Sequence, residues 1–165
     1  MSYPDPVYRG DGGAESATLR PADAKPDLVY GNGTRVHYLM KGEWARGLFG
    51  LHRWEMSGEV SGPGPHFHRS ITESFYVLSG SIRFYDGRHW IDTSPGDFVH
   101  VPEGGVHGFR NESGAPASML IHFAPGAPRE AYFEGPAAML NGLTMTDEEK
   151  AEFYRIHDTF WLPEN

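Results

Sequence analysis

Two histidine clusters joined by a strand-rich connector limit what this chain can fold into more than any other feature. The first cluster is Pro65-His66-Phe67-His68-Arg69-Ser70-Ile71-Thr72-Glu73, and the second runs from Gly96 to Asn111. Side chains two residues apart in a strand share a face, so we expect His66 and His68 to point the same way. Two imidazoles on one face, followed by the Glu73 carboxylate, form half of a metal site. A third histidine from a distant strand would complete it.

The spacing of these residues resembles the two motifs of the cupin superfamily. The first family motif is G-x5-H-x-H-x3,4-E-x6-G, which the chain matches at His66, His68, Glu73 and Gly80, with Val60 in place of the opening glycine. The second is G-x5-P-x-G-x2-H-x3-N, which is matched throughout by Gly96, Pro102, Gly104, His107 and Asn111.

The resemblance implies an all-β fold, a single antiparallel β-barrel of the jelly-roll type. It also implies one metal ion held by four ligands, His66, His68, Glu73 and His107. Three imidazoles and a carboxylate suit a divalent transition metal, and Fe, Mn, Ni, Cu and Zn are all compatible with this set. The alternative is a degenerate cupin that has lost its metal, which the intact ligand types argue against.

The other motif residues and histidines have structural explanations. Gly96 and Gly104 are expected to take positive φ angles in turns, and Asn111 to anchor a turn by hydrogen bonding. Histidines outside the motifs are interpreted as surface or satisfied core residues; these are His37, His89, His100 and His157.

The pattern along the chain also predicts a β fold of about eight to eleven short strands. Asn32-Gly33 and Asp86-Gly87 are tight-turn signals between strand-like runs. Residues 48–56 alternate, and the pair Arg53 and Glu55 on one face suggests that His52, Trp54 and Met56 face inward. Three segments are expected: an irregular N-terminal arm (1–27), the barrel (28–125) and a C-terminal helical extension (126–165).

The C-terminal extension carries the helical signals. Residues 129–134 and 136–140 are interpreted as short helical turns broken at Gly135-Pro136. Thr146-Asp147-Glu148-Glu149 has the form of a capping box, which predicts a helix from Asp147 to about Thr159. Its apolar face would consist of Phe153, Ile156 and Phe160 and pack outside the barrel.

A substrate pocket is predicted from the alternation of inward positions. Strand parity with the metal ligands turns further side chains inward, and the set that would line an apolar cavity is His52, Trp54, Met56, Phe75, Val77 and Phe109. The alternative is a filled core, because small barrels pack their interiors with side chains. A flat enol or phenol would fit the cavity.

Three functions are compatible with these residues. The resemblance to quercetin-dioxygenase-like cupins favours a metal-dependent dioxygenase acting on an enolisable aromatic or polyketide-like molecule. Glu73 would ligate the metal or take the substrate proton as general base, with O₂ as co-substrate. With redox-silent zinc, the same site could run a cyclisation or isomerisation. The third function is non-enzymatic binding of a small molecule.

The composition of the chain limits which partners it can bind and where in the cell it is expected. The chain has 165 residues, 14 basic against 22 acidic residues, a net charge of −8 and no cysteine. Phosphate binding needs a basic patch, so nucleic acid is excluded as a partner. The apolar runs are too short for a membrane span and no secretory signal is visible, so we expect a soluble, cytoplasmic protein. The resemblance further implies a homodimer.

Overall fold

Alternating burial along three long strands builds the core of the fold. These strands are β3 (Gly50–Met56), β5 (Thr72–Ser79) and β10 (Ala117–Ala124), with β10 between the other two. Every second residue of β10 is buried, and β3 buries Gly50, His52, Trp54 and Met56, which confirms the predicted inward face of that strand. The computed structural model describes residues 2–13 and 17–163 of the chain.

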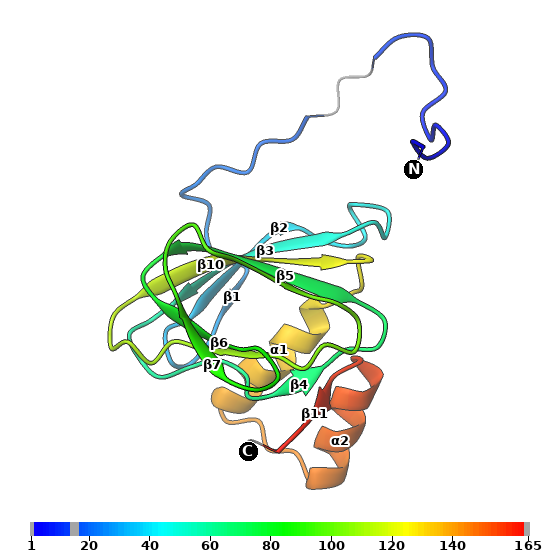
Figure 1. The fold of residues 1–165 in the computed structure, drawn as a ribbon. Helices are drawn as coiled ribbons and strands as arrows, with labels where there is room; N and C mark the ends of the chain where they lie inside the picture. Colours follow the sequence, from blue (N-terminus) through cyan, green and yellow to red (C-terminus); the bar gives the residue numbers. More distant parts are fainter. Residues whose placement is uncertain (1, 14–16, 164–165) are drawn as a thin grey trace.

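The described strands form three antiparallel sheets. The six-stranded sheet has the order β1 (Leu28–Val29), β2 (Arg35–Met40), β3, β10, β5, β8 (Phe98–Val101). A second sheet pairs β6 (Ile82–Tyr85) with β7 (Trp90–Thr93) and β9 (Gly108–Arg110). The third pairs β4 (His66–Phe67) with β11 (Phe160–Trp161). The architecture is the predicted antiparallel jelly roll, built from separate sheets instead of one continuous closed barrel (Figure 1).

The turn residues of the two motifs behave as predicted. Gly96 and Gly104 have φ angles of 97° and 78°, a region that residues with a Cβ atom rarely adopt. The amide of Asn111 donates to the main-chain oxygens of Ser57 and Ala115 at 2.7 and 2.8 Å, so it anchors a turn. The motifs therefore fix the loops that carry the histidines.

Helix α1 (Glu130–Leu140) corrects one prediction. The chain does not break at Gly135-Pro136, because a single helix runs through Pro136. The missing N–H of Pro136 leaves a carbonyl in the preceding turn without its helical partner, but packing compensates. Tyr132 and Phe133 of this helix are buried, and a Cβ atom at Gly135 would lie 2.2 Å from the ring of Phe153, so only glycine allows that contact.

Helix α2 (Asp147–Ile156) begins at the predicted capping box. The hydroxyl of Thr146 accepts from the Glu149 N–H, and the Glu149 carboxylate accepts from the Thr146 N–H. The predicted apolar face is wrong at two of its three positions. Ile156 is 60% exposed, and Phe160 lies beyond the helix in β11, where its ring stacks on Phe67. Both helices lie at the same end of the jelly roll (Figure 1).

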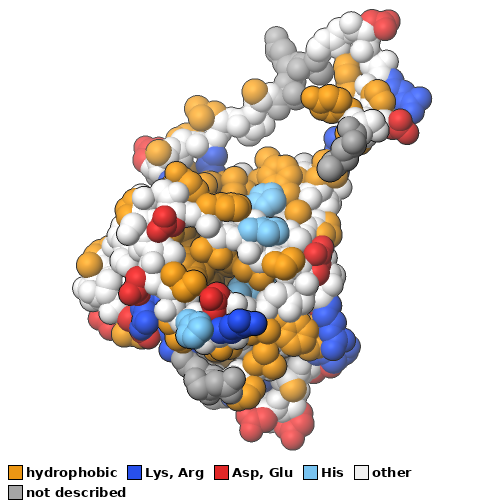
Figure 2. Space-filling model, in the orientation of Figure 1, with side chains coloured by type: hydrophobic (Ala, Val, Ile, Leu, Met, Phe, Trp, Pro, Cys, Tyr) orange, Lys and Arg blue, Asp and Glu red, His pale blue; other side chains and the backbone are white. Residues whose placement is uncertain are grey.

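The described part of the N-terminal arm contains no strand or helix before Leu28 and extends away from the sheets (Figure 1). Residues 1 and 14–16 of the arm, and 164–165 of the C-terminal extension, lie outside the described residues. Hydrophobic side chains cover much of the domain face in Figure 2, with charged side chains mainly toward its edges. Within residues 2–13 and 17–163, the helices are too short or too polar to cross a membrane.

Candidate metal centre

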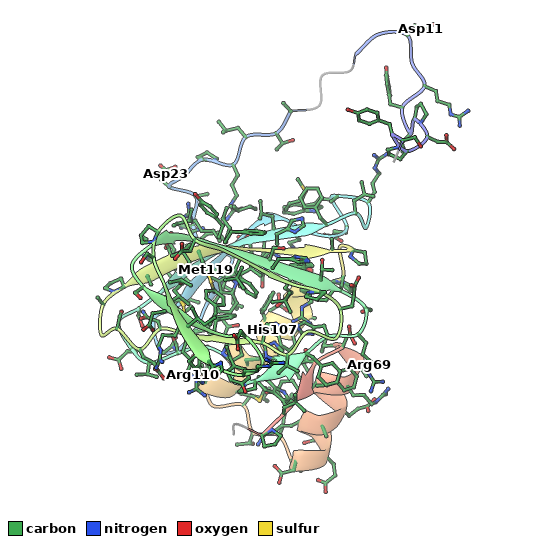
Figure 3. The ribbon with its side chains drawn as sticks, viewed as in Figure 1. Asp11, Asp23, Arg69, His107, Arg110 and Met119 are labelled. Atoms are coloured by element: carbon green, nitrogen blue, oxygen red, sulfur yellow. The ribbon has the colours of Figure 1, made fainter. Side chains whose placement is uncertain are left out.

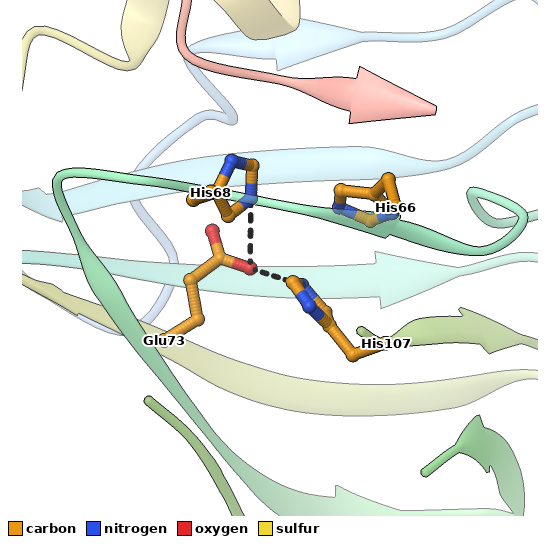
Figure 4. Close-up of side chains that lie close together, drawn as sticks. All are labelled: His66, His68, Glu73 and His107. Carbon is orange, nitrogen blue, oxygen red and sulfur yellow. Dashed lines mark hydrogen bonds and ion pairs between the residues drawn. The ribbon is translucent and has the colours of Figure 1, made fainter. Parts of the chain in front are cut away.

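The four residues of the predicted ligand set lie together at the end of the jelly roll nearest the helices. His66 is on β4, His68 follows it, Glu73 is on β5 and His107 directly precedes β9. One ligand atom from each lies within 4.8 Å of the others, and all four residues are buried (Figure 4). His107 and Arg69 lie toward the helical end of the domain, whereas Met119 lies among the strands (Figure 3).

Main-chain pairing fixes the distance between the two histidine clusters. His66 and His107 form an antiparallel bridge in which each N–H donates to the other's carbonyl at 2.8 Å. The rings of these two residues are 4.3 Å apart, and that of His68 is 5.0 Å from His66. Two motifs that are distant in sequence therefore meet through backbone hydrogen bonds.

Each of the three imidazoles has its Nδ1 atom against a main-chain carbonyl oxygen. The acceptors are Gly64 for His66 at 2.8 Å, Gly105 for His107 at 3.0 Å and Asp158 for His68 at 2.6 Å. A carbonyl oxygen can only accept, so Nδ1 carries the proton in all three rings. The Nε2 atoms are left with the lone pairs that a metal requires.

The carboxylate of Glu73 lies beside these Nε2 atoms. Oε2 is 3.0 Å from Nε2 of His107 and 3.6 Å from Nε2 of His68. Burial alone would raise the pKa of Glu73, but the close contacts of its carboxylate with His107 and His68 outweigh burial and hold the pKa well below its usual range. Glu73 is therefore ionised at neutral pH, as a metal ligand must be.

His66 is held neutral by its surroundings. Burial, followed by the neighbouring His107 and His68, lowers the pKa of His66 to about 3. A neutral imidazole at physiological pH is the form that binds metal. The Nε2 atom of His68 is buried without a hydrogen-bond partner in the described residues, which is costly unless a ligand satisfies it. The donor set and this unsatisfied nitrogen fit one divalent transition metal ion.

Two residues beside the cluster carry no signal in the sequence. Arg129, the residue before α1, places its guanidinium 3.8 Å from Oε1 of Glu73 and is 3% exposed. Asp158 follows α2 with a φ of 52°, and its carboxylate accepts from the N–H groups of Arg69 and Ser70. Both come from the C-terminal extension, so the extension forms part of the metal centre.

A cavity of about 450 Å³ lies beside the metal centre. Six of its lining side chains are aromatic: Tyr30, Trp54, Tyr132, Phe133, Tyr154 and Trp161. The ring of Trp161 is 5.1 Å from that of His66, and Tyr132 carries the Arg129 guanidinium on its face at 4.0 Å. The cavity wall therefore touches both the first histidine and the cation beside Glu73.

The structure separates the residues that the sequence grouped as a pocket. Trp54 and Met56 belong to the cavity lining. Phe75, Val77 and Phe109 are buried in the hydrophobic core, and the ring of Phe75 lies 6.0 Å from that of His107. His52 is fully buried, with Nε2 at 3.6 Å from the carboxylate of Glu130. Outside the metal cluster, His89 and His100 are exposed and His37 is buried near Glu55.

Comparison with known proteins identifies a cupin domain in the chain. Residues 53–123 match the family model of the cupin domain. A stretch of 61 residues is 39% identical to quercetin 2,3-dioxygenase of Bacillus subtilis (strain 168), and it covers 33% of this chain and only 18% of that enzyme.

Two solved structures share the fold at low sequence identity. A predicted oxalate decarboxylase from Thermotoga maritima superposes with a TM-score of 0.58 at 18% identity, over 65% of this chain and 97% of that one. The polyketide cyclase RemF from Streptomyces resistomycificus gives a TM-score of 0.55 at 24% identity, over 66% and 79% of the two chains. Residues 53–123 therefore match a cupin domain, and the shared jelly-roll fold and the buried histidine–glutamate cluster agree with that match.

Proposed function

We propose that the protein is a metal-dependent dioxygenase that acts on an enolisable aromatic or polyketide-like small molecule. The observation that supports this most is the contact between the aromatic cavity and the metal centre through Trp161 and His66. In this proposal a flat, partly apolar molecule binds in the cavity, whose lining reaches the ligand residues through the contact between the rings of Trp161 and His66.

In this proposal His66, His68, Glu73 and His107 hold the metal ion. When bound, the metal would supply Lewis-acid and one-electron chemistry toward the substrate oxygen and O₂. Glu73 is also the proposed catalytic residue, whose carboxylate would accept the hydroxyl proton of an enol or phenol. Trp54 and Phe133, whose rings meet edge to face at 5.3 Å, would orient the flat substrate and exclude water.

The test combines metal analysis with oxygen uptake. Protein purified without added metal is analysed for bound transition metals and then screened in an oxygen electrode against flavonols, simple phenols and acyclic enols. We expect oxygen consumption that depends on substrate and on metal occupancy. His68→Ala should remove most of the bound metal and of the oxygen uptake, whereas His89→Ala, at a histidine exposed in the β6–β7 turn, should change neither.

A redox-silent cyclase or isomerase is the second candidate, because three imidazoles and a carboxylate also suit zinc. Turnover of the same substrates without oxygen, in protein loaded with zinc, would establish this function and overturn the dioxygenase. Saturable ligand binding without turnover under either condition would establish the third candidate, a non-enzymatic small-molecule-binding cupin.

A further inference from the structure

The two carboxylate oxygens of Glu73 face different partners. Oε2 lies toward the Nε2 atoms of His107 and His68, at 3.0 and 3.6 Å. Oε1 lies 3.8 Å from the guanidinium of Arg129. A carboxylate that is free to turn can bind a metal through one oxygen or through both. A neighbour that holds Oε1 in place would therefore limit how much of the metal's coordination shell Glu73 can occupy.

Arg129 is held in place by contacts that are independent of Glu73. Its Nη1 donates to the main-chain oxygen of His157 at 2.8 Å. Its guanidinium lies over the ring of Tyr132 at 4.0 Å and that of Phe133 at 5.4 Å. A buried cation fixed on three sides cannot follow the carboxylate if the carboxylate turns. The guanidinium is thus a fixed point against which Oε1 is oriented.

We propose that Arg129 is a positioning residue of the metal centre. It holds Oε1 of Glu73 off the metal, so that Glu73 binds through Oε2 alone and a coordination position stays free for an incoming ligand. This inference rests on the proposed role of Glu73 as a ligand. It explains why an arginine is present, because its fork reaches His157 and Glu73 at once, whereas a lysine ammonium has no such fork.

A purely structural ion pair would behave differently. If Arg129 only balanced the buried charge of Glu73, its removal would lower stability and leave the coordination of a bound metal unchanged. If Arg129 positions Oε1, its removal frees that oxygen to reach the metal and take the open position. The geometry of the loaded metal, and its affinity for a small exogenous anion, separate these two roles.

The experiment loads the full chain with Co²⁺, whose visible spectrum reports coordination number, and titrates it with azide. We expect Arg129→Met to change the spectrum and to weaken azide binding by about 10- to 100-fold, the range typical for altered partners of metal ligands. Arg129→Lys should keep the buried charge and recover part of the azide affinity. Arg155→Met is the matched control, because Arg155 is exposed on α2 and pairs only with Glu152 in the described contacts.

A folded Arg129→Met protein with the wild-type spectrum and azide affinity would overturn the inference. A crystal structure of the metal-loaded wild type is a second measurement, which does not depend on a variant that folds. We expect only Oε2 of Glu73 at ligand distance, about 2.0–2.2 Å from the metal, and both oxygens at that distance would overturn the inference. Wild-type protein that binds no metal overturns the proposed function as well, so the two failures are distinguishable.

Discussion

The main-chain carbonyl oxygen of Asp158 accepts a hydrogen bond of 2.6 Å from Nδ1 of His68, across 90 residues of sequence. The Asp158 carboxylate also accepts from the Ser70 N–H and hydroxyl at 2.8 and 2.6 Å. The residue thus clamps the loop that carries His68 and fixes the tautomer of the ring. Partners of this kind raise the basicity of a metal-binding imidazole and fix its direction.

Replacing Asp158 should therefore weaken metal binding. We expect Asp158→Ala to lower the affinity by about 10- to 100-fold, because the loop loses its carboxylate acceptor. Asp158→Asn should lose less, since one oxygen remains and asparagine tolerates the left-handed backbone at φ 52°. Competition with a chelator measures the affinity. Asp147→Ala, at a fully exposed aspartate of α2, is the control, and equal losses in Asp158→Ala and Asp147→Ala would contradict the prediction.

Replacing a single histidine of the ligand set should be enough to lose most of the bound metal. His68→Ala and His107→Ala should each remove most of the metal, because each takes away an Nε2 atom that lies next to the Glu73 carboxylate. Atomic absorption on protein exchanged into metal-free buffer gives the occupancy. If either variant kept full occupancy under conditions matched to the wild type, that histidine would not be a ligand.

Glu73→Gln separates ligation from proton transfer. Three histidines remain in this variant, so we expect it to keep much of the metal. Its turnover per bound metal should fall by about 10²–10⁴-fold, the usual contribution of general base catalysis. Weakly acidic phenols should lose more rate than acidic enols, which need less help to ionise. Rates across substrates of graded acidity provide the measurement, and an equal loss for all of them would leave Glu73 as a ligand only.

His52 should make the metal-free protein less stable in acid. Burial, with a smaller effect of Arg129, lowers the pKa of His52 to about 4 in the folded state. The ordinary pKa of histidine, which applies in the unfolded chain, is 6.5. The unfolded chain therefore binds the extra proton between these pH values. The contribution of His52 to the free energy of unfolding is fully present above pH 6.5 and is lost progressively as the pH falls toward 4. The full loss amounts to roughly 3 kcal/mol.

His52→Phe tests this pH dependence with an aromatic ring of similar size in the same place. Urea unfolding of both metal-free proteins at several pH values gives the difference in unfolding free energy. We expect the variant to gain stability relative to the wild type as the pH is lowered from 7 to 4. A difference that stays constant with pH would mean that His52 is protonated equally in both states.

Local patterns predicted the parts of the fold that depend on near neighbours. The alternation around Trp54, the capping box at Thr146 and the positive φ of Gly96 and Gly104 all follow from residues close in sequence. The ligand set was predicted because family motifs encode a spacing. The continuous helix through Pro136 was missed, since tertiary packing of Phe153 on Gly135 outweighs the local signal.

Long-range geometry explains what the sequence could not reveal. Arg129 and Asp158 lie far from both histidine clusters in the chain, and neither belongs to a motif. Arg129 contributes a buried cation, and Asp158 contributes, besides its carboxylate, a main-chain oxygen that any residue type could supply. Their roles depend on where the C-terminal extension returns to the jelly roll. Pattern and spacing carry no information on that return.

The pairing of β11 with β4 sets an order of events during synthesis of the chain. Residues 66–107 leave the ribosome before residues 158–161, and translation of the intervening segment takes on the order of seconds. Throughout that interval the Nδ1 atom of His68 has no Asp158 carbonyl to bond, and the edge of β4 is without the strand that it pairs with in the finished fold. The hydrogen bond that fixes the His68 ring and the last strand beside β4 are thus among the final contacts that the chain can make.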